Sequence, residues 1–201
     1  MSLEQYMIEK AVLATRNKGK VKEFSELLLG VVANVVSLDD LEDPPEVVED
    51  GETFKDNALK KARAICEYSG LPALADDSGL EVDALGGRPG VYSARYAGAG
   101  ASDSDNYEKL LEELGDDPDR RARFVCVLAL VFPDGKEITS EGECPGMITD
   151  GPRGEGGFGY DPVFYVPGKA KTMAELPPEV KNELSHRARA VRNLIEILGS
   201  P

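Results

Sequence analysis

The chain has 201 residues, of which 41% are hydrophobic and 30% charged, and its formal net charge at pH 7 is −14. These values are typical of one soluble globular domain, and they argue against collagen-like, coiled-coil and disordered chains. The acidic excess disfavours a nucleic acid or an anionic membrane surface as a partner, because both require a basic face. We therefore expect an anionic ligand to bind where the chain is locally basic or where a cation joins it.

Hydropathy and cysteine usage indicate the compartment. The longest apolar run, Phe124–Phe132, has nine residues, about half of the roughly 20 that span a membrane as a helix. The first residues lack a basic start followed by an apolar stretch, so we expect no signal peptide. Cys66, Cys126 and Cys144 form no CxxC pair and His186 is the only histidine, which argues against structural zinc. Two of the three cysteines lie in apolar or sheet-like contexts and are expected to be buried thiols, and a reducing, cytoplasmic compartment is expected.

Strand and helix patterns alternate in the first third of the chain. They predict a strand at Ala11–Thr15, a helix from about Gly19 to Leu29 and a strand at Asn34–Leu38. The segment that follows, Asp39–Glu52, holds eight acids and no base, which predicts a loop. Asp50 is expected to cap the next helix, which the pattern ends at Gly70.

The rest of the chain predicts a β-rich middle and a helical end. A short strand at Ala73–Ala75 is expected to break at Asp76–Gly79, Ser102 to open a helix, and the strands Arg123–Phe132 and Lys136–Glu143 to form a hairpin around Pro133–Gly135. A continuous terminal helix would place Arg187 on its apolar stripe, so we expect a break near Ser185. The whole pattern predicts an α/β fold with a mixed sheet, with a second lobe and a ligand cleft between the lobes.

Four segments carry candidate chemistry. The first, Thr15-Arg16-Asn17-Lys18-Gly19-Lys20, follows a strand and opens a helix, which is the setting of an anion site. Four bases fall between Arg16 and Lys22, although the helix dipole disfavours cations at a helix start. The GxxxxGK[ST] spacing is absent, so this is no Walker A loop. The segment is either a phosphate-binding turn or a solvated first turn of a helix.

The second segment contains paired carboxylates. Asp76 and Asp77 end a short apolar strand, and adjacent strand residues point to opposite faces. Glu49 lies at the end of the acidic loop. Magnesium takes one or two protein carboxylates and completes its shell with water and phosphate oxygens. Glu49 with Asp77 fits that pattern, while a plain turn and a capped helix start would explain the same residues.

The third and fourth segments offer groups for a base. In Gly156–Pro162 the glycines permit close backbone approach, and Phe158 or Tyr160 could stack on a ring. In Ser185-His186-Arg187 the lone histidine is more often structural than catalytic. The position of Arg187 on the apolar stripe of a continuous helix favours a functional role for Ser185-His186-Arg187.

Taken in order, these segments resemble the inosine/xanthosine triphosphate pyrophosphatase family, also called the Ham1 family. The resemblance is carried by Ala14–Lys20, Glu49–Phe54, Asp56-Asn57-Ala58, Ala75–Val82, Leu85–Tyr96, Gly156–Pro162 and Ser185–Arg187, which span nearly the whole chain. It implies a single domain over residues 1–201: an elongated, two-lobed α/β fold around a mixed, twisted sheet flanked by helices, of the type shared with Maf proteins, with a central nucleotide cleft. The family is usually homodimeric.

The resemblance also implies the reaction and the roles of residues. Members hydrolyse ITP, dITP and XTP, with magnesium, to the monophosphate and pyrophosphate, and so clear deaminated purines from the nucleotide pool. Asp77 is the implied proton acceptor and metal ligand, Glu49 the second metal ligand, and Lys20 a catalytic cation. The implied substrate-binding residues are Thr15, Arg16, Asn17, Lys18, Gly19, Lys20, Ser78, Phe158, Gly159, Tyr160, Asp161, Lys181, His186 and Arg187.

Two departures from the family pattern and two rival functions stand beside this interpretation. Asp56 replaces a common Glu, and Ala188-Arg189 replaces a frequent Gly-Gln, without touching the assigned chemistry. Residues 1–9 lie outside the matching motifs. The rivals are a Maf-like nucleotide pyrophosphatase, which lacks the Ser-His-Arg end, and a nucleotide-binding sensor without turnover.

Overall fold

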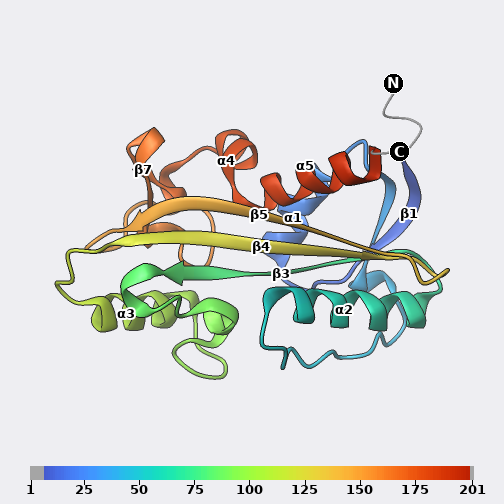
Figure 1. Ribbon diagram of the computed structural model, residues 1–201, viewed down its shortest axis with the longest axis horizontal. Coiled ribbons are helices and arrows are strands. Elements are labelled where there is room, and N and C mark those ends of the chain that lie inside the picture. The colour runs from blue at the N-terminus through green and yellow to red at the C-terminus, as the bar shows by residue number, and fades with distance from the viewer. Residues whose placement is uncertain (1–6, 200–201) are drawn as a thin grey trace. The chain divides into compact units, whose positions relative to one another are not determined.

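The computed structural model describes residues 7–199. Its elements are β1 (Ile8–Leu13), α1 (Lys18–Leu27), β2 (Val32–Ser37), α2 (Phe54–Ser69), β3 (Ala73–Val82), α3 (Asp103–Leu114), β4 (Arg121–Val131), β5 (Glu137–Ile148), β6 (Phe164–Val166), β7 (Lys171–Thr172), α4 (Pro178–Leu184) and α5 (His186–Gly199), joined in part by short 3₁₀ turns (Figure 1). Part of the N-terminal segment outside the family motifs, residues 1–6, lies outside the described residues.

The strands form one mixed sheet in the order β2-β1-β3-β4-β5-β6-β7. β1 pairs in parallel with β2 and β3, while β6 pairs antiparallel with both β5 and β7. Parallel pairing of β1 with β2 and β3 follows from the helices that connect them, whereas the Pro133–Gly135 turn reverses the chain between β4 and β5. The predicted α/β fold with a mixed sheet is confirmed.

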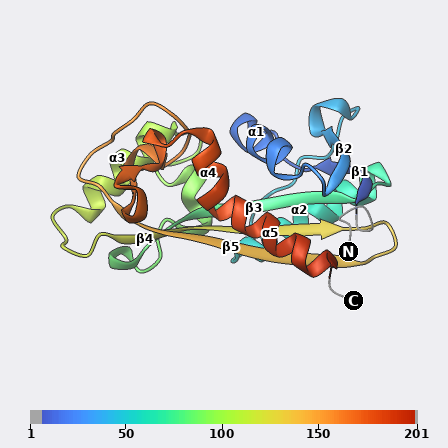
Figure 2. The ribbon, with the colours of Figure 1, turned by 90° about the horizontal axis from the view of Figure 1, so that it is seen from above.

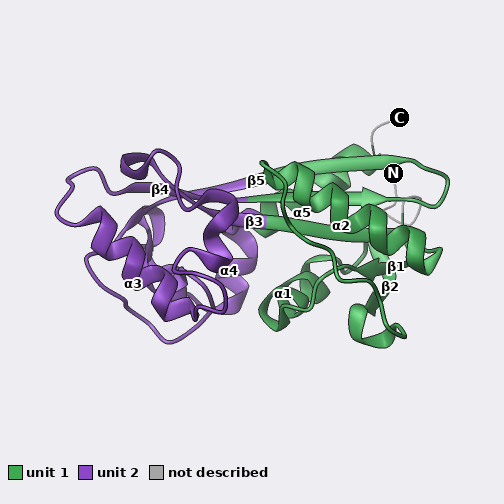
Figure 3. Cartoon of the chain, turned by 90° about the horizontal axis from the view of Figure 1, so that it is seen from below, with its two compact units in different colours: residues 1–77, 126–142, 187–201 green, residues 78–125, 143–186 purple. Residues whose placement is uncertain are grey.

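The chain divides into two compact units. The first comprises residues 1–77, 126–142 and 187–201, and the second comprises residues 78–125 and 143–186 (Figure 3). β3, β4 and β5 contribute residues to both units. Each unit has its own core, so each can position its functional side chains on a packed base.

In the first unit, helices cover both faces of the strands. α1 and α5 lie on one face and α2 on the other (Figures 1 and 2). On the α1/α5 face, Phe24 of α1 and Leu194 of α5 are buried against Leu13, Leu74 and Leu128 of the strands. Packing of this apolar layer places the first turns of α1 and α5 at the middle of the strands. These first turns carry polar side chains.

In the second unit, α3 packs through Leu110 against a cluster that includes Leu80 of β3 and Phe124 of β4. Phe164 and Met173 from the segment after β5 complete this core. Ser102 caps α3 as predicted, because its side chain accepts the N–H of Asp105. The glycine-rich loop Gly156–Pro162 is therefore followed closely by a strand, β6, that packs in this core through Phe164.

Several other predictions are confirmed. The terminal helix breaks at Ser185, where extended backbone separates α4 from α5. Cys66, Cys126 and Cys144 are buried and form no disulfide.

No helix within residues 7–199 is both long enough and apolar enough to cross a membrane.

Two predictions about local structure are wrong. β3 does not end at Ala75 but continues through Asp76-Asp77-Ser78-Gly79 to Val82. This sequence favours a turn in isolation, yet here it lies in a strand between β1 and β4, where Lys20 of α1 pairs with Asp76 and Asn57 of α2 donates to Asp77. The cap of α2 is Thr53 rather than Asp50, because Thr53 Oγ1 accepts the N–H of Asp56.

Candidate active site

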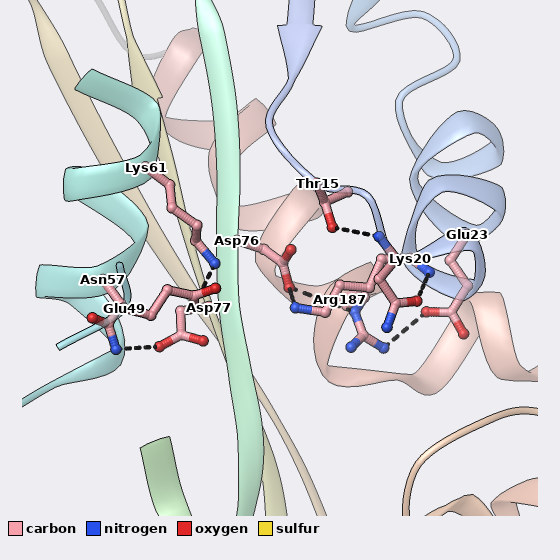
Figure 4. Close-up of polar contacts among 10 residues, drawn as sticks. Thr15, Lys20, Glu23, Glu49, Asn57, Lys61, Asp76, Asp77 and Arg187 are labelled. Carbon is pink, nitrogen blue, oxygen red and sulfur yellow. Dashed lines mark hydrogen bonds and ion pairs between the residues drawn. The ribbon is translucent and has the colours of Figure 1, made fainter. Parts of the chain in front are cut away.

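The site in the first unit is organised by two adjacent carboxylates in the middle of β3. Asp76 faces α1 and α5, whereas Asp77 faces α2, as expected from the alternation of side chains along a strand (Figure 4). Both are buried. Because a buried carboxylate needs compensating charge or hydrogen bonds, each one imposes a polar cluster on its side of the strand.

Asp76 is the anchor of a cationic cluster. Its side chain has no exposed surface, and its Oδ2 lies 2.8 Å from Lys20 Nζ and 3.8 Å from Arg187 Nε. Burial by itself would raise the pKa of Asp76, but Lys20, Arg187 and Lys61 outweigh it and lower the pKa to about 2. Asp76 is therefore a permanent anion that holds two cations in place.

Arg187 extends this cluster to α1. Its Nη1 lies 3.0 Å from Glu23 Oε2, and its side chain is 6% exposed. The break at Ser185 places Arg187 in the first turn of α5, from which it reaches both Asp76 and Glu23 (Figure 4). Arg187 and Lys20 thus share one carboxylate although they lie 167 positions apart in the sequence.

The segment predicted to bind an anion forms the capped start of α1. Asn17 is the N-cap and accepts the N–H of Lys20 at 3.0 Å, while Thr15 Oγ1 accepts the N–H of Asn17 at 3.2 Å. Backbone N–H groups at the start of this ten-residue helix and the ammonium of Lys20 supply donors and positive charge. Arg16 lies outside the cluster, because its exposed guanidinium is 3.8 Å from Asp39.

On the other side of β3, Asp77 lies with residues of α2 and of the acidic loop. Asn57 Nδ2 donates to Asp77 Oδ2 at 3.0 Å, and Lys61 Nζ donates to Glu49 Oε2 at 2.8 Å. Figure 4 shows Asp77, Asn57, Glu49 and Lys61 gathered beside α2. The two carboxylates predicted to hold a metal are thus brought to the same side of β3.

Electrostatics distinguish Asp77 from its neighbour. Burial, together with Glu49, raises the pKa of Asp77 to about 6, although Lys61 and Asn57 act in the opposite direction. Burial alone would lower the pKa of Lys61, but Asp76, Glu49 and Asp77 raise it above its ordinary value. Asp77 thus combines partial burial with incomplete charge compensation, which suits a group that accepts a proton or binds a cation.

The donor set beside Asp77 suits a cation that needs few protein ligands. Among residues 7–199 no group of three or more His, Cys, Asp or Glu side chains could hold a metal ion. Glu49 and Asp77 alone match Mg²⁺, which commonly takes one or two carboxylates and fills its shell with water and phosphate oxygens. The pKa of Asp77 is raised mainly by burial and in smaller part by Glu49, and a bound cation would favour the charged form of both carboxylates.

In the second unit, three predicted binding residues form a compact group. Lys181 Nζ lies 2.7 Å from Asp161 Oδ2 and 4.8 Å from the centroid of the Phe158 ring. Asp161 Oδ2 also accepts the N–H of Phe158 at 3.0 Å. Gly157 makes this possible, since a methyl group there would lie 2.0 Å from Asp161 Oδ2. One buried carboxylate therefore fixes both the backbone and the cation beside the aromatic ring.

The remaining predicted residues of the second unit have structural contacts. Tyr160 is buried, its hydroxyl donates to the carbonyl of Ser93 at 2.8 Å, and burial raises its pKa. His186 is buried and stacks on Phe124, with ring centroids 4.8 Å apart. Ser78 belongs to this unit as well. These contacts give Tyr160 and His186 a packing role beside any contact with a ligand.

Sequence reasoning assigned no role to three residues of the first-unit site. Asn57 and Lys61 lie one turn apart on α2, so they share a helix face, and Glu23 lies on α1. The spacing of Asn57 and Lys61 was a usable signal, because a buried Asn and a Lys on one helix face require polar partners. Glu23 could not be found in this way, since its partner Arg187 lies far away in sequence.

Comparisons with known proteins agree with this architecture. The sequence profile of the Ham1 family matches residues 11–197. A protein named dITP/XTP pyrophosphatase from Geobacter sulfurreducens is 57% identical over 192 residues, covering 94% of this chain and 96% of that protein. One of the same name from Desulforamulus reducens is 56% identical over 191 residues, covering 94% of this chain and 95% of that protein.

Solved structures agree as well. The Ham1 protein of Staphylococcus aureus superposes with a TM-score of 0.85 at 45% identity, covering 94% of this chain and 98% of that one. A HAM1 protein from Coxiella burnetii gives a TM-score of 0.86 at 43% identity, covering 95% and 98%. The chain belongs to the Ham1 family.

Asp76 should make the metal-free protein sensitive to acid. Its pKa is about 2 in the folded chain against an ordinary value of 3.8, so its stabilisation is present above about pH 4 and is lost as the pH falls toward 2, a contribution of about 2 kcal/mol. Asp76→Asn should destabilise the protein by about 3 kcal/mol at pH 7, because Lys20 and Arg187 lose their carboxylate. The free energy of unfolding, measured in urea with EDTA, should differ less between Asp76→Asn and the wild type at pH 3 than at pH 7. A difference that stays constant with pH would contradict this role.

Gly157 and Gly159 provide a matched pair in the second unit. Both have positive φ, +78° and +62°, but only at Gly157 does an added methyl meet Asp161. Gly159→Ala should cost about 1–2 kcal/mol for the left-handed backbone. Gly157→Ala should cost at least about 2 kcal/mol more, because it also disrupts the buried Asp161–Lys181 pair. Equal shifts of the thermal unfolding midpoint in the two variants would show that Asp161 is not displaced.

Proposed function

We propose that this chain hydrolyses deaminated purine nucleoside triphosphates, namely dITP, ITP and XTP, to the monophosphate and pyrophosphate. The observation that carries the proposal is Asp77 of β3, a buried carboxylate with a pKa raised to about 6 that lies beside Glu49. The residue before it on the strand, Asp76, anchors Lys20. The names of the relatives at 57% and 56% identity support the same substrates. Such an enzyme removes damaged nucleotides before a polymerase can use them.

Phosphate binding is assigned to the first turn of α1. The N–H groups of Lys18 and Gly19 and the ammonium of Lys20 provide donors and charge for the triphosphate. Because Asp76 fixes Lys20 at 2.8 Å, the cation keeps its position before substrate arrives. Preorganised charge of this kind stabilises the charge that develops on phosphoryl oxygens during hydrolysis.

Asp77 is assigned the proton of the attacking water. In the reaction a P–O bond of the α–β bridge breaks, the water oxygen bonds to phosphorus, and its proton passes to the Asp77 carboxylate. A carboxylate whose pKa is about 6 remains ionised at pH 7 and is more basic than an ordinary aspartate, so it is well suited to this transfer. Glu49 and Asp77 would hold Mg²⁺, which would supply positive charge to the phosphates when bound.

Recognition of the base is assigned to donors and to an aromatic face. Inosine and xanthosine carry an oxygen at purine C6 where adenosine carries an amino group, so a donor-only side chain discriminates between them. Arg187 has that property, and His186 next to it can donate as well. Phe158, held by Asp161 and backed by Lys181, offers a ring for stacking. We therefore expect ATP to be rejected more strongly than GTP, which shares the C6 oxygen.

Three further features complete the proposal. A homodimer and magnesium dependence follow from the resemblance and a cytoplasmic location from the cysteine usage, and all three remain predictions. The partner is a small-molecule nucleotide rather than a nucleic acid, since the net charge is −14. Sedimentation of the purified protein would test the dimer.

The decisive experiment measures pyrophosphate release from dITP, XTP, GTP and ATP, with and without MgCl₂. Asp77→Asn should keep the fold and lower kcat by about 10²–10⁴-fold, because the base is lost. Asp116→Asn, on the surface after α3, is the control and should behave as the wild type. Near-normal turnover by Asp77→Asn would refute the assignment of the base.

The same assay on the wild type separates the two rival functions. Binding of dITP without pyrophosphate release would favour a nucleotide-binding sensor. Preference for GTP or ATP would favour a Maf-like enzyme.

Lys20 should affect both catalysis and binding. Lys20→Ala removes a fixed cation from the phosphate site, so kcat should fall and KM should rise, with kcat/KM for dITP reduced by at least about 10²-fold. Lys22→Ala, an exposed position on the same helix, is the matched control with the same change of charge. If the two variants lose activity equally, net charge rather than the position of Lys20 explains the effect.

A further inference from the structure

Asn57 joins two segments that carry the carboxylates. Its side chain is buried within α2, with 1% exposed surface. Nδ2 donates to Asp77 Oδ2 at 3.0 Å, and Oδ1 accepts the N–H of Gly51 at 2.8 Å. Gly51 lies two residues after Glu49, so one amide contacts β3 at Asp77 and the acidic loop next to Glu49.

The amide of Asn57 suits both contacts because it carries a donor and an acceptor. A carboxylate can only accept a hydrogen bond and a backbone N–H can only donate one, so the side chain between them must present a donor to one and an acceptor to the other. A charged aspartate lacks the donor for Asp77, and a leucine of similar size lacks both groups. Only one orientation of the Asn57 amide satisfies both partners, which fixes that orientation.

Gly51 is adapted to this contact. A methyl group at position 51 would lie 2.7 Å from Asn57 Oδ1 and 2.9 Å from Asp56 Cβ. The loop therefore approaches α2 so closely that only glycine fits without a shift. Lys61, one turn further along the same helix, holds Glu49 Oε2 at 2.8 Å. The helix thus fixes the loop at two points, the backbone N–H of Gly51 and the carboxylate of Glu49.

We propose that Asn57 is a positioning residue that sets the geometry of Glu49 relative to Asp77 and thereby the affinity for a divalent cation. The inference rests on the proposed function, because it takes these two carboxylates as the cation ligands. Groups that orient metal ligands through hydrogen bonds commonly change metal affinity or activity by about 10–100-fold when they are removed. Asn57 has this relation to Asp77 directly and to Glu49 through the backbone of the loop.

The test compares Asn57→Ala and Gly51→Ala with a matched control. Asn57→Ala removes both hydrogen bonds, whereas Gly51→Ala leaves the amide present but displaces it. Asn106→Ala is the control: Asn106 is also a buried helical asparagine and also accepts a loop N–H, from Ala97 at 2.8 Å, but it belongs to the second unit. All three variants should lower the thermal unfolding midpoint.

Two measurements on the resting protein separate positioning from general stability. Mn²⁺ binding, followed by the electron paramagnetic resonance signal of the free ion, should weaken at least about 10-fold in Asn57→Ala and Gly51→Ala and stay unchanged in Asn106→Ala. Amide hydrogen exchange of the peptide that contains Gly51 should accelerate in Asn57→Ala and not in Asn106→Ala.

Unchanged Mn²⁺ affinity in both first-unit variants, or no Mn²⁺ binding by the wild type, would overturn the inference. Neither measurement needs turnover, so a failure of the inference about Asn57 can be distinguished from a failure of the proposed function. Wild-type protein that binds Mn²⁺ but releases no pyrophosphate from dITP would refute the function and leave the role of Asn57 in cation binding supported.

Discussion

The first-unit site depends on one constraint: two adjacent carboxylates lie buried in the middle of β3. Removing a charged group from water is unfavourable by several kcal/mol unless ion pairs or hydrogen bonds compensate it. Since neighbouring strand residues face opposite ways, Asp76 and Asp77 have different hydrogen-bond and ion-pair partners, although Lys20 and Lys61 influence both pKa values. Lys20 and Arg187 therefore gather on one side, and Asn57 and residues near it on the other.

The two carboxylates are compensated to different degrees, and this difference separates their roles. Two close cations lower the pKa of Asp76 to about 2, so it remains charged and serves as a fixed anchor. Asp77 has an amide and more distant charges, so burial dominates and its pKa rises to about 6. Adjacent groups of the same type thus differ in pKa, one lowered and one raised, because of what α1, α5 and α2 bring to each face.

The second unit uses a similar arrangement for a different purpose. Asp161 is a buried carboxylate paired with one cation, Lys181, and it also accepts the backbone N–H of Phe158. The pair holds an aromatic ring and a loop rather than a reactive group. In both units, therefore, a buried anion orders side chains or loops that would otherwise be free to move, and local glycines, Gly51 and Gly157, permit the close approach.

The sequence by itself determined the fold class, the helix that starts after Thr15-Arg16-Asn17 and the break at Ser185, because periodicity, capping residues and glycine placement act over a few residues. It also singled out Glu49 and Asp77, since their residue types limit the chemistry. Only the tertiary structure decided that β3 continues through Asp76-Asp77-Ser78-Gly79, that Arg187 pairs with Glu23, and that Asn57 links Gly51 to Asp77. These contacts join distant segments, and their energies arise from burial that a linear pattern of residues does not contain.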